Sequence, residues 1–85
     1  MTTLTFPRLR ELILEAAGDD ESIIFDESRL DATFESMGYD SLAFMETVSR
    51  IERTYGVDLP EEDVMAQKTP RALLDFVNDR IATTE

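Results

Sequence analysis

The chain has 85 residues, and 19 acidic against 8 basic side chains give it a formal net charge of −11 at pH 7. Nucleic acids and anionic membranes are recognised through Lys and Arg, so this balance argues against both as partners. It favours solubility, and it equally favours encounters with basic protein surfaces. The sequence has no His, which removes the most common catalytic base and a common metal ligand.

A single domain spanning 1–85 is expected, because a chain of this length buries only a limited core. No apolar run approaches the length of a membrane span, and the N-terminal segment lacks the apolar core of a signal peptide. The absence of Cys suits a reducing compartment. We therefore expect a cytoplasmic protein that is a monomer.

The helical spacing of apolar residues predicts a first helix over 6–17, which a glycine follows. A second predicted helix begins at Asp40 or Ser41. It ends at Tyr55, because Gly56 is typical of a C-terminal stop. The predicted inward stripe of the second helix consists of Leu42, Met45, Val48, Ile51 and Tyr55.

A short third helix is predicted after Pro60, where three acidic residues in the first turn suit the helix dipole. The last predicted helix opens at Thr69, which can cap it, and Pro70 occupies the first helical position, where proline is tolerated. Its predicted buried face consists of Leu73, Leu74, Phe76, Val77 and Ile81.

Residues 18–39 connect the first two predicted helices. A structureless loop of this length is unusual in so small a domain. We therefore predict an ordered loop with a helical turn over 30–36. The side chains expected to hold it on the bundle are Ile23, Ile24, Phe25, Leu30, Phe34 and Met37. The predicted fold is all-α: a small four-helix bundle of three long helices and one short helix, with the long loop packed across one end.

The segment Gly38-Tyr39-Asp40-Ser41-Leu42 places a serine at the mouth of the second predicted helix. The chain has no His or Cys to activate this serine. The adjacent Asp40 is not expected to act as its base, because consecutive residues on a helix point in different directions. We therefore predict no catalytic residue, and the acidic residues do not have the spacing of a metal site. The position suits modification instead, because a phosphodiester there would meet free backbone N–H groups and the positive end of the helix dipole.

Segment 38–42 resembles the attachment motif of acyl carrier proteins, in which the serine of Asp-Ser-Leu carries 4′-phosphopantetheine. The run Tyr-Gly-Val-Asp-Leu-Pro at 55–60 is similar to the segment that precedes the third helix in this family, and 69–78 is similar to the family's final helix. The run Gly-Tyr-Asp-Ser-Leu-Ala-x-Met-Glu-Thr is similar to carriers of type II (aromatic) polyketide synthases, which implies antibiotic biosynthesis. Phe44 stands where many such carriers have leucine.

The resemblance implies that Ser41 bears the phosphopantetheine arm and that Asp40 and Leu42 belong to its site. Asp40 is expected to cap the helix, and Leu42 to anchor its start or to lie under the arm. The arm would hold malonyl units and the growing chain as thioesters. The implied partners are a phosphopantetheinyl transferase, a malonyl transferase, a ketosynthase and tailoring enzymes. A fatty-acid or peptidyl carrier, and an acidic helical adaptor without a prosthetic group, are the alternatives.

In this family, acidic side chains after the attachment serine meet basic surfaces of partner enzymes. The candidates here are Glu46, Glu52, Glu61 and Glu62. A solvated helix face is the plainer explanation of Glu46 and Glu52. Compensation of the helix dipole is the plainer explanation of Glu61 and Glu62. Arg50 lies four residues after Glu46, a spacing that favours an ion pair, so Glu52 is expected to be the freer charge.

Two polar residues, Arg10 and Asn78, lie beside the apolar stripes of the first and last predicted helices. If they reach inward, they would hydrogen-bond the carbonyl groups of an attached acyl chain, since buried oxygens need partners. An orientation toward water is an equally good expectation for both.

Overall fold

The structure is a computed structural model, and it describes residues 3–17 and 27–84. The helices are α1 (Phe6–Ala17), α2 (Ser41–Tyr55), α3 (Glu61–Met65) and α4 (Pro70–Thr84), with 3₁₀ turns at Glu27–Arg29 and Glu35–Met37. Within the described ranges no strand occurs, and the predicted all-α class and the bounds of its helices are confirmed. In the same ranges, no helix is both long and apolar enough to cross a membrane.

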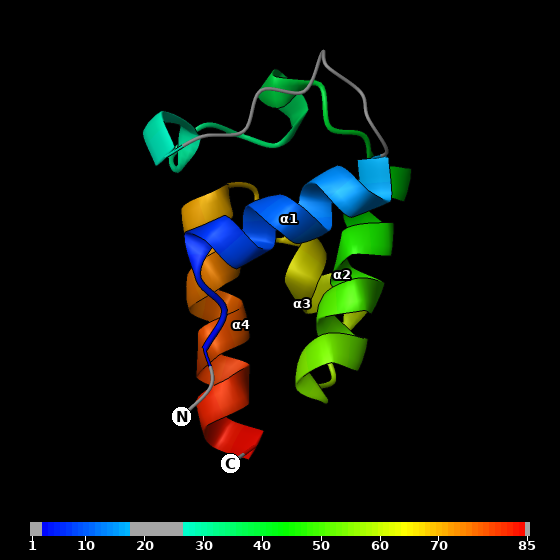
Figure 1. The fold of residues 1–85 in the computed structure, drawn as a ribbon, viewed down its shortest axis with the longest axis vertical. Helices are drawn as coiled ribbons and strands as arrows, with labels where there is room; N and C mark the ends of the chain where they lie inside the picture. Colours follow the sequence, from blue (N-terminus) through cyan, green and yellow to red (C-terminus); the bar gives the residue numbers. More distant parts are fainter. Residues whose placement is uncertain (1–2, 18–26, 85) are drawn as a thin grey trace.

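The helices are arranged so that α2 and α4 start near the same end of the molecule, and the segment 27–40 lies across that end (Figure 1). α1 packs against α2. The short segment before α1 runs beside α4, where the backbone N–H of Leu4 donates to the side-chain oxygen of Asn78 at 2.6 Å. The start of α2, which carries the serine of interest, is therefore at the end of the bundle that the loop covers.

Local signals set both ends of α2. The carboxylate of Asp40 accepts the N–H of Ala43 at 2.8 Å, as a capping side chain does, a contact that contributes about 1 kcal/mol. At the other end Gly56 adopts the left-handed conformation, with φ of 65°, and its N–H donates to the carbonyl of Glu52. Both predicted caps of this helix are confirmed.

The buried face of α2 is rotated from the predicted stripe. Its buried residues are Phe44, Thr47, Val48 and Ile51, whereas Met45 and Tyr55 are only partly buried. The prediction that Leu42 points inward is wrong, because its side chain is 80% exposed. The loop explains the rotation: the ring of Phe34 packs edge-on against that of Phe44 at 5.0 Å between centroids, so Phe44 takes the inward position.

In residues 27–39, the part of the loop that the structure describes, the turns differ from the prediction. Instead of one helical turn over 30–36, 3₁₀ turns occur at 27–29 and 35–37. The later start of the second turn follows from Thr33, whose hydroxyl accepts the N–H of Ser36 at 3.1 Å. Phe34 and Met37 are buried, as predicted, and Leu30 is partly buried. The predicted contacts of residues 23–25 lie outside the described residues.

Helices α3 and α4 also begin as predicted. The hydroxyl of Thr69 accepts the N–H of Ala72 at 3.2 Å and so caps α4. The buried residues of α4 are Leu73, Val77 and Ile81, and Leu74 and Phe76 pack against the core from partly buried positions.

Glu52 is not the free charge that was expected. Its side-chain oxygen accepts the N–H of Leu59 at 2.9 Å, and Leu59 is 3% exposed. The carboxylate therefore satisfies a backbone donor in the connection between α2 and α3, where an unpaired N–H would be costly. This contact links the end of α2 to the segment that leads into α3.

Substitution Glu52→Ala removes this acceptor and is expected to lower the free energy of unfolding by about 1–3 kcal/mol, because the Leu59 N–H loses its partner. Urea denaturation followed by circular dichroism measures the change. Glu52→Gln is the matched control, since its amide oxygen can still accept the bond and most of the stability should remain. An alanine variant as stable as the natural chain would contradict this role.

Candidate functional site

Ser41 is the first residue of α2, and its side chain is exposed. The first turn of a helix leaves backbone N–H groups without intrahelical partners. Here the N–H of Ala43 is taken by the Asp40 carboxylate, and the N–H of Phe44 donates to the Asp40 carbonyl at 3.0 Å. Because Ser41 is exposed, its hydroxyl can be reached by an approaching molecule, at the positive end of the helix dipole.

Leu42 does not anchor the start of the helix in the way that the sequence suggested. Its side chain projects into solvent directly after Ser41, and it is one of two large hydrophobic side chains of the described residues that are exposed. An apolar side chain in this position is free to contact whatever approaches the serine.

The residue before the cap, Tyr39, holds segment 38–42 against α2. Its ring is 5% exposed, and its hydroxyl is hydrogen-bonded to the hydroxyl of Thr47 and donates to the carbonyl oxygen of Ala43 at 3.1 Å. The Tyr39 ring also lies 5.8 Å from that of Phe34. These contacts join the loop to the first two turns of α2, and they therefore determine where Ser41 stands.

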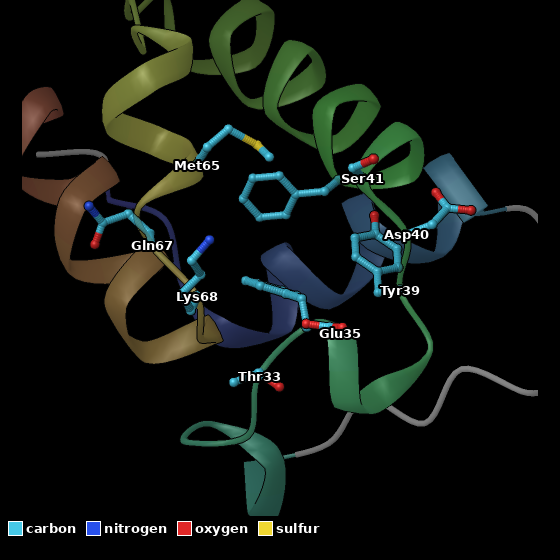
Figure 2. A pocket seen from close by; sticks show the side chains of 10 residues that line it. Thr33, Glu35, Tyr39, Asp40, Ser41, Met65, Gln67 and Lys68 are labelled. Carbon is cyan, nitrogen blue, oxygen red and sulfur yellow. The ribbon is translucent and has the colours of Figure 1, made fainter.

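A pocket of about 480 Å³ opens beside Ser41 (Figure 2). The loop and the start of α2 form one side of it, and α3 with the connection to α4 forms the other. Its lining residues are Thr33, Phe34, Glu35, Tyr39, Asp40, Ser41, Phe44, Met65, Gln67 and Lys68. Four of these residues are aromatic or apolar, and the other six are polar or charged.

Residues from the α3–α4 side of this pocket were missed by the sequence analysis. They are far from Ser41 in the chain, and they come near it because the N–H of Phe34 donates to the carbonyl oxygen of Lys68 at 3.0 Å. No local pattern in the sequence predicts this backbone contact.

The acidic residues predicted to contact partner enzymes differ in their surroundings. Glu46 is paired with Arg50 at 3.4 Å, which confirms the expected ion pair, and Arg50 also lies 3.5 Å from Glu15 on α1. Glu61 and Glu62 are exposed in the first turn of α3. Within residues 3–17 and 27–84, no group of acidic side chains is arranged to hold a metal ion.

Arg10 and Asn78 lie outside the pocket beside Ser41. Arg10 is exposed on α1. The amide of Asn78 is engaged with Leu4, since it accepts the Leu4 N–H at 2.6 Å and donates to the Leu4 carbonyl at 2.9 Å. Their role as contacts of an acyl chain stays a prediction.

Burial raises the pKa of Tyr39 from 10.0 to about 12, against the opposing effect of its hydrogen bond with Thr47. The folded chain favours the neutral hydroxyl of Tyr39, because the pKa of this group is higher there than in the unfolded chain. The contribution of this hydroxyl to the free energy of unfolding is therefore complete below about pH 10 and is lost as the pH rises through about 12. Over this interval the free energy of unfolding should fall further for the natural chain than for Tyr39→Phe, by up to about 3 kcal/mol. Urea denaturation at stepped pH measures both, and parallel profiles would contradict the buried hydroxyl.

Known proteins with similar sequences belong to one family. The family model "Phosphopantetheine attachment site" matches residues 7–77. The chain is 49% identical to the granaticin polyketide synthase acyl carrier protein of Streptomyces violaceoruber, over 92% of both chains, and 48% identical to an anthracycline acyl carrier protein of Streptomyces peucetius, over 95% of both.

Among solved structures, the solution structure of 3,5-dioxohexyl ACP, a triketide mimic from the actinorhodin polyketide synthase of Streptomyces coelicolor, matches with a TM-score of 0.88. Its sequence identity is 42%, and the match covers 99% of this chain and 98% of that one. The chain therefore belongs to the phosphopantetheine-attachment family, as an acyl carrier protein similar to those of type II polyketide synthases.

Proposed function

We propose that Ser41 is the residue to which 4′-phosphopantetheine is attached, and that the chain carries malonyl units and a growing polyketide as thioesters on that arm. The observation that carries this proposal is the exposed serine in the first turn of α2, directly behind the capping Asp40. When bound, the arm supplies a thiol that holds acyl groups. We assign no catalytic step to the chain itself.

The start of α2 favours modification at this oxygen. In transfer from coenzyme A, the Ser41 oxygen forms a bond to phosphorus and loses its proton, while the nucleotide portion leaves. The positive end of the helix dipole favours the resulting negative charge by about 0.3–1 kcal/mol. Leu42, 80% exposed beside the serine, offers an apolar contact to the transferase.

The pocket beside Ser41 is the proposed resting place of a short acyl chain. Its volume of about 480 Å³ lies within the range of small-molecule sites, and its walls include the aromatic and apolar side chains of Phe34, Phe44 and Met65. The solved relative from the actinorhodin synthase is described as bearing a 3,5-dioxohexyl chain. We propose Arg10 and Asn78 as contacts only for a longer chain, because neither lines this pocket.

The proposed partners are a phosphopantetheinyl transferase, a malonyl transferase, a ketosynthase and tailoring enzymes. A net charge of −11 steers the carrier toward basic surfaces, and the exposed Glu46, Glu61 and Glu62 are the proposed contacts. Attraction of this kind speeds association without strong binding, which suits a carrier that must leave each enzyme for the next. The free thiol of the arm requires a reducing compartment, so we propose the cytoplasm.

Incubation with coenzyme A and a broad-specificity phosphopantetheinyl transferase should raise the intact mass by one phosphopantetheine. Ser41→Ala should abolish the increase without changing the far-ultraviolet circular dichroism, because this side chain is exposed. Ser49→Ala, an exposed serine later on the same helix, is the matched control and should be modified as before. An unchanged mass of the natural chain would favour the alternative of an adaptor without a prosthetic group.

Glu46→Lys is expected to raise the KM of the holo-protein for a partner enzyme by about two- to fivefold at low salt, and by less at high salt. The reason is that exposed charges are screened within about 10 Å at 0.1 M salt and about 3 Å at 1 M. The matched control is Asp79→Lys, an equal change of charge on the part of α4 that lies at the opposite end of the bundle (Figure 1). Equal effects of the two variants would mean that only the net charge matters.

A further inference from the structure

The pocket beside Ser41 has a single positive charge. Among its ten lining residues only Lys68 is basic, and Lys68 is also the one lysine of the chain. Figure 2 shows its ammonium group directed into the space between the two walls, on the opposite side from Ser41 and Asp40. In a chain with a net charge of −11, an isolated cation marks a place where an anionic group of a ligand is favoured.

The backbone of Lys68 is fixed by a hydrogen bond, whereas its side chain forms no ion pair with the described residues. Its carbonyl oxygen accepts the Phe34 N–H at 3.0 Å, and the next residue, Thr69, caps α4. No acidic side chain of the described residues forms an ion pair with Lys68. The arginines that do form ion pairs are Arg8, Arg50, Arg71 and Arg80. Among the described residues, the ammonium group therefore lies at the pocket without an ion-pair partner.

The other charged groups of the pocket, the carboxylates of Glu35 and Asp40, repel an anion. Glu35 and Asp40 carry carboxylates on the side of the loop and α2, and Asp40 already accepts the Ala43 N–H. An acyl group with a carboxylate at its free end is therefore directed away from the start of α2 and toward Lys68.

We propose that Lys68 recognises the carboxylate of a malonyl thioester carried on the arm, and so holds this cargo at the pocket in preference to an acetyl thioester. The inference rests on the proposed attachment at Ser41. Malonyl and acetyl differ by one carboxylate, so a single ammonium group at the far side of the pocket distinguishes them. An exposed ion pair of this kind corresponds to a preference of about two- to fivefold.

The first test observes the ammonium group directly. Reductive methylation with ¹³C-formaldehyde labels Lys68 as the one lysine and leaves its charge in place. The labelled chain is loaded with malonyl- or acetyl-phosphopantetheine from the corresponding coenzyme A thioester, and intact mass verifies the loading. The Lys68 methyl signal should shift in the malonyl form, in a manner that salt suppresses, and should stay in place in the acetyl form.

This experiment distinguishes a failure of the proposed role of Lys68 from a failure of the proposed attachment at Ser41. An equal shift in both forms would show that the arm itself is responsible, and an absent shift in both would show no contact, so either result overturns the role of Lys68. A chain whose mass does not change on incubation overturns the attachment at Ser41 instead.

The second test measures protection of the cargo. Hydroxylamine cleaves both thioesters, and the ratio of the malonyl to the acetyl half-life should fall about two- to fivefold in Lys68→Gln. Lys68→Arg, which keeps the charge, should retain the ratio. Arg53→Gln, which removes one exposed cation of α2 that does not line the pocket, should also retain it. The proposal is overturned if Arg53→Gln lowers the ratio as much as Lys68→Gln does.

Discussion

The site depends on one packing constraint, the contact between the loop and the first turns of α2. The Tyr39 hydroxyl is hydrogen-bonded to Thr47 and to the Ala43 carbonyl, while the ring of Phe34 packs against that of Phe44. Because Tyr39 directly precedes the cap of α2, these contacts determine the direction from which the chain enters the helix. The serine that follows the cap is thereby presented outward, although Tyr39 before the cap and Phe44 after the serine are buried.

The same loop builds the pocket, because Phe34 has contacts on two sides. Its ring contacts α2, and its N–H donates to the carbonyl of Lys68 in the connection between α3 and α4. A second contact of the loop joins the Arg71 N–H to the Leu30 carbonyl at 3.0 Å. The two walls of the pocket are thus held by backbone hydrogen bonds, which are less easily changed by substitution than contacts between side chains.

Several charged side chains of this protein have a structural role. Arg50 lies between Glu46 and Glu15 and so connects α2 to α1, and Glu52 satisfies the backbone N–H of Leu59. Acidic residues of the same helix consequently differ in what they can do. Those that are exposed are available to partners, whereas a carboxylate engaged with the backbone is part of the fold, even though both contribute to the same net charge.

The sequence by itself determined the features that depend on near neighbours. These are the helix bounds, the caps at Asp40 and Thr69, the left-handed Gly56 and the place of Ser41 in a first turn, because capping and helical spacing act over three or four residues. Only the tertiary structure decided that Leu42 faces water, that Glu52 meets Leu59, and that Lys68 lies across a pocket from the serine. Each of these results depends on segments that meet only after folding, and neither helical periodicity nor local charge spacing describes which segments will meet.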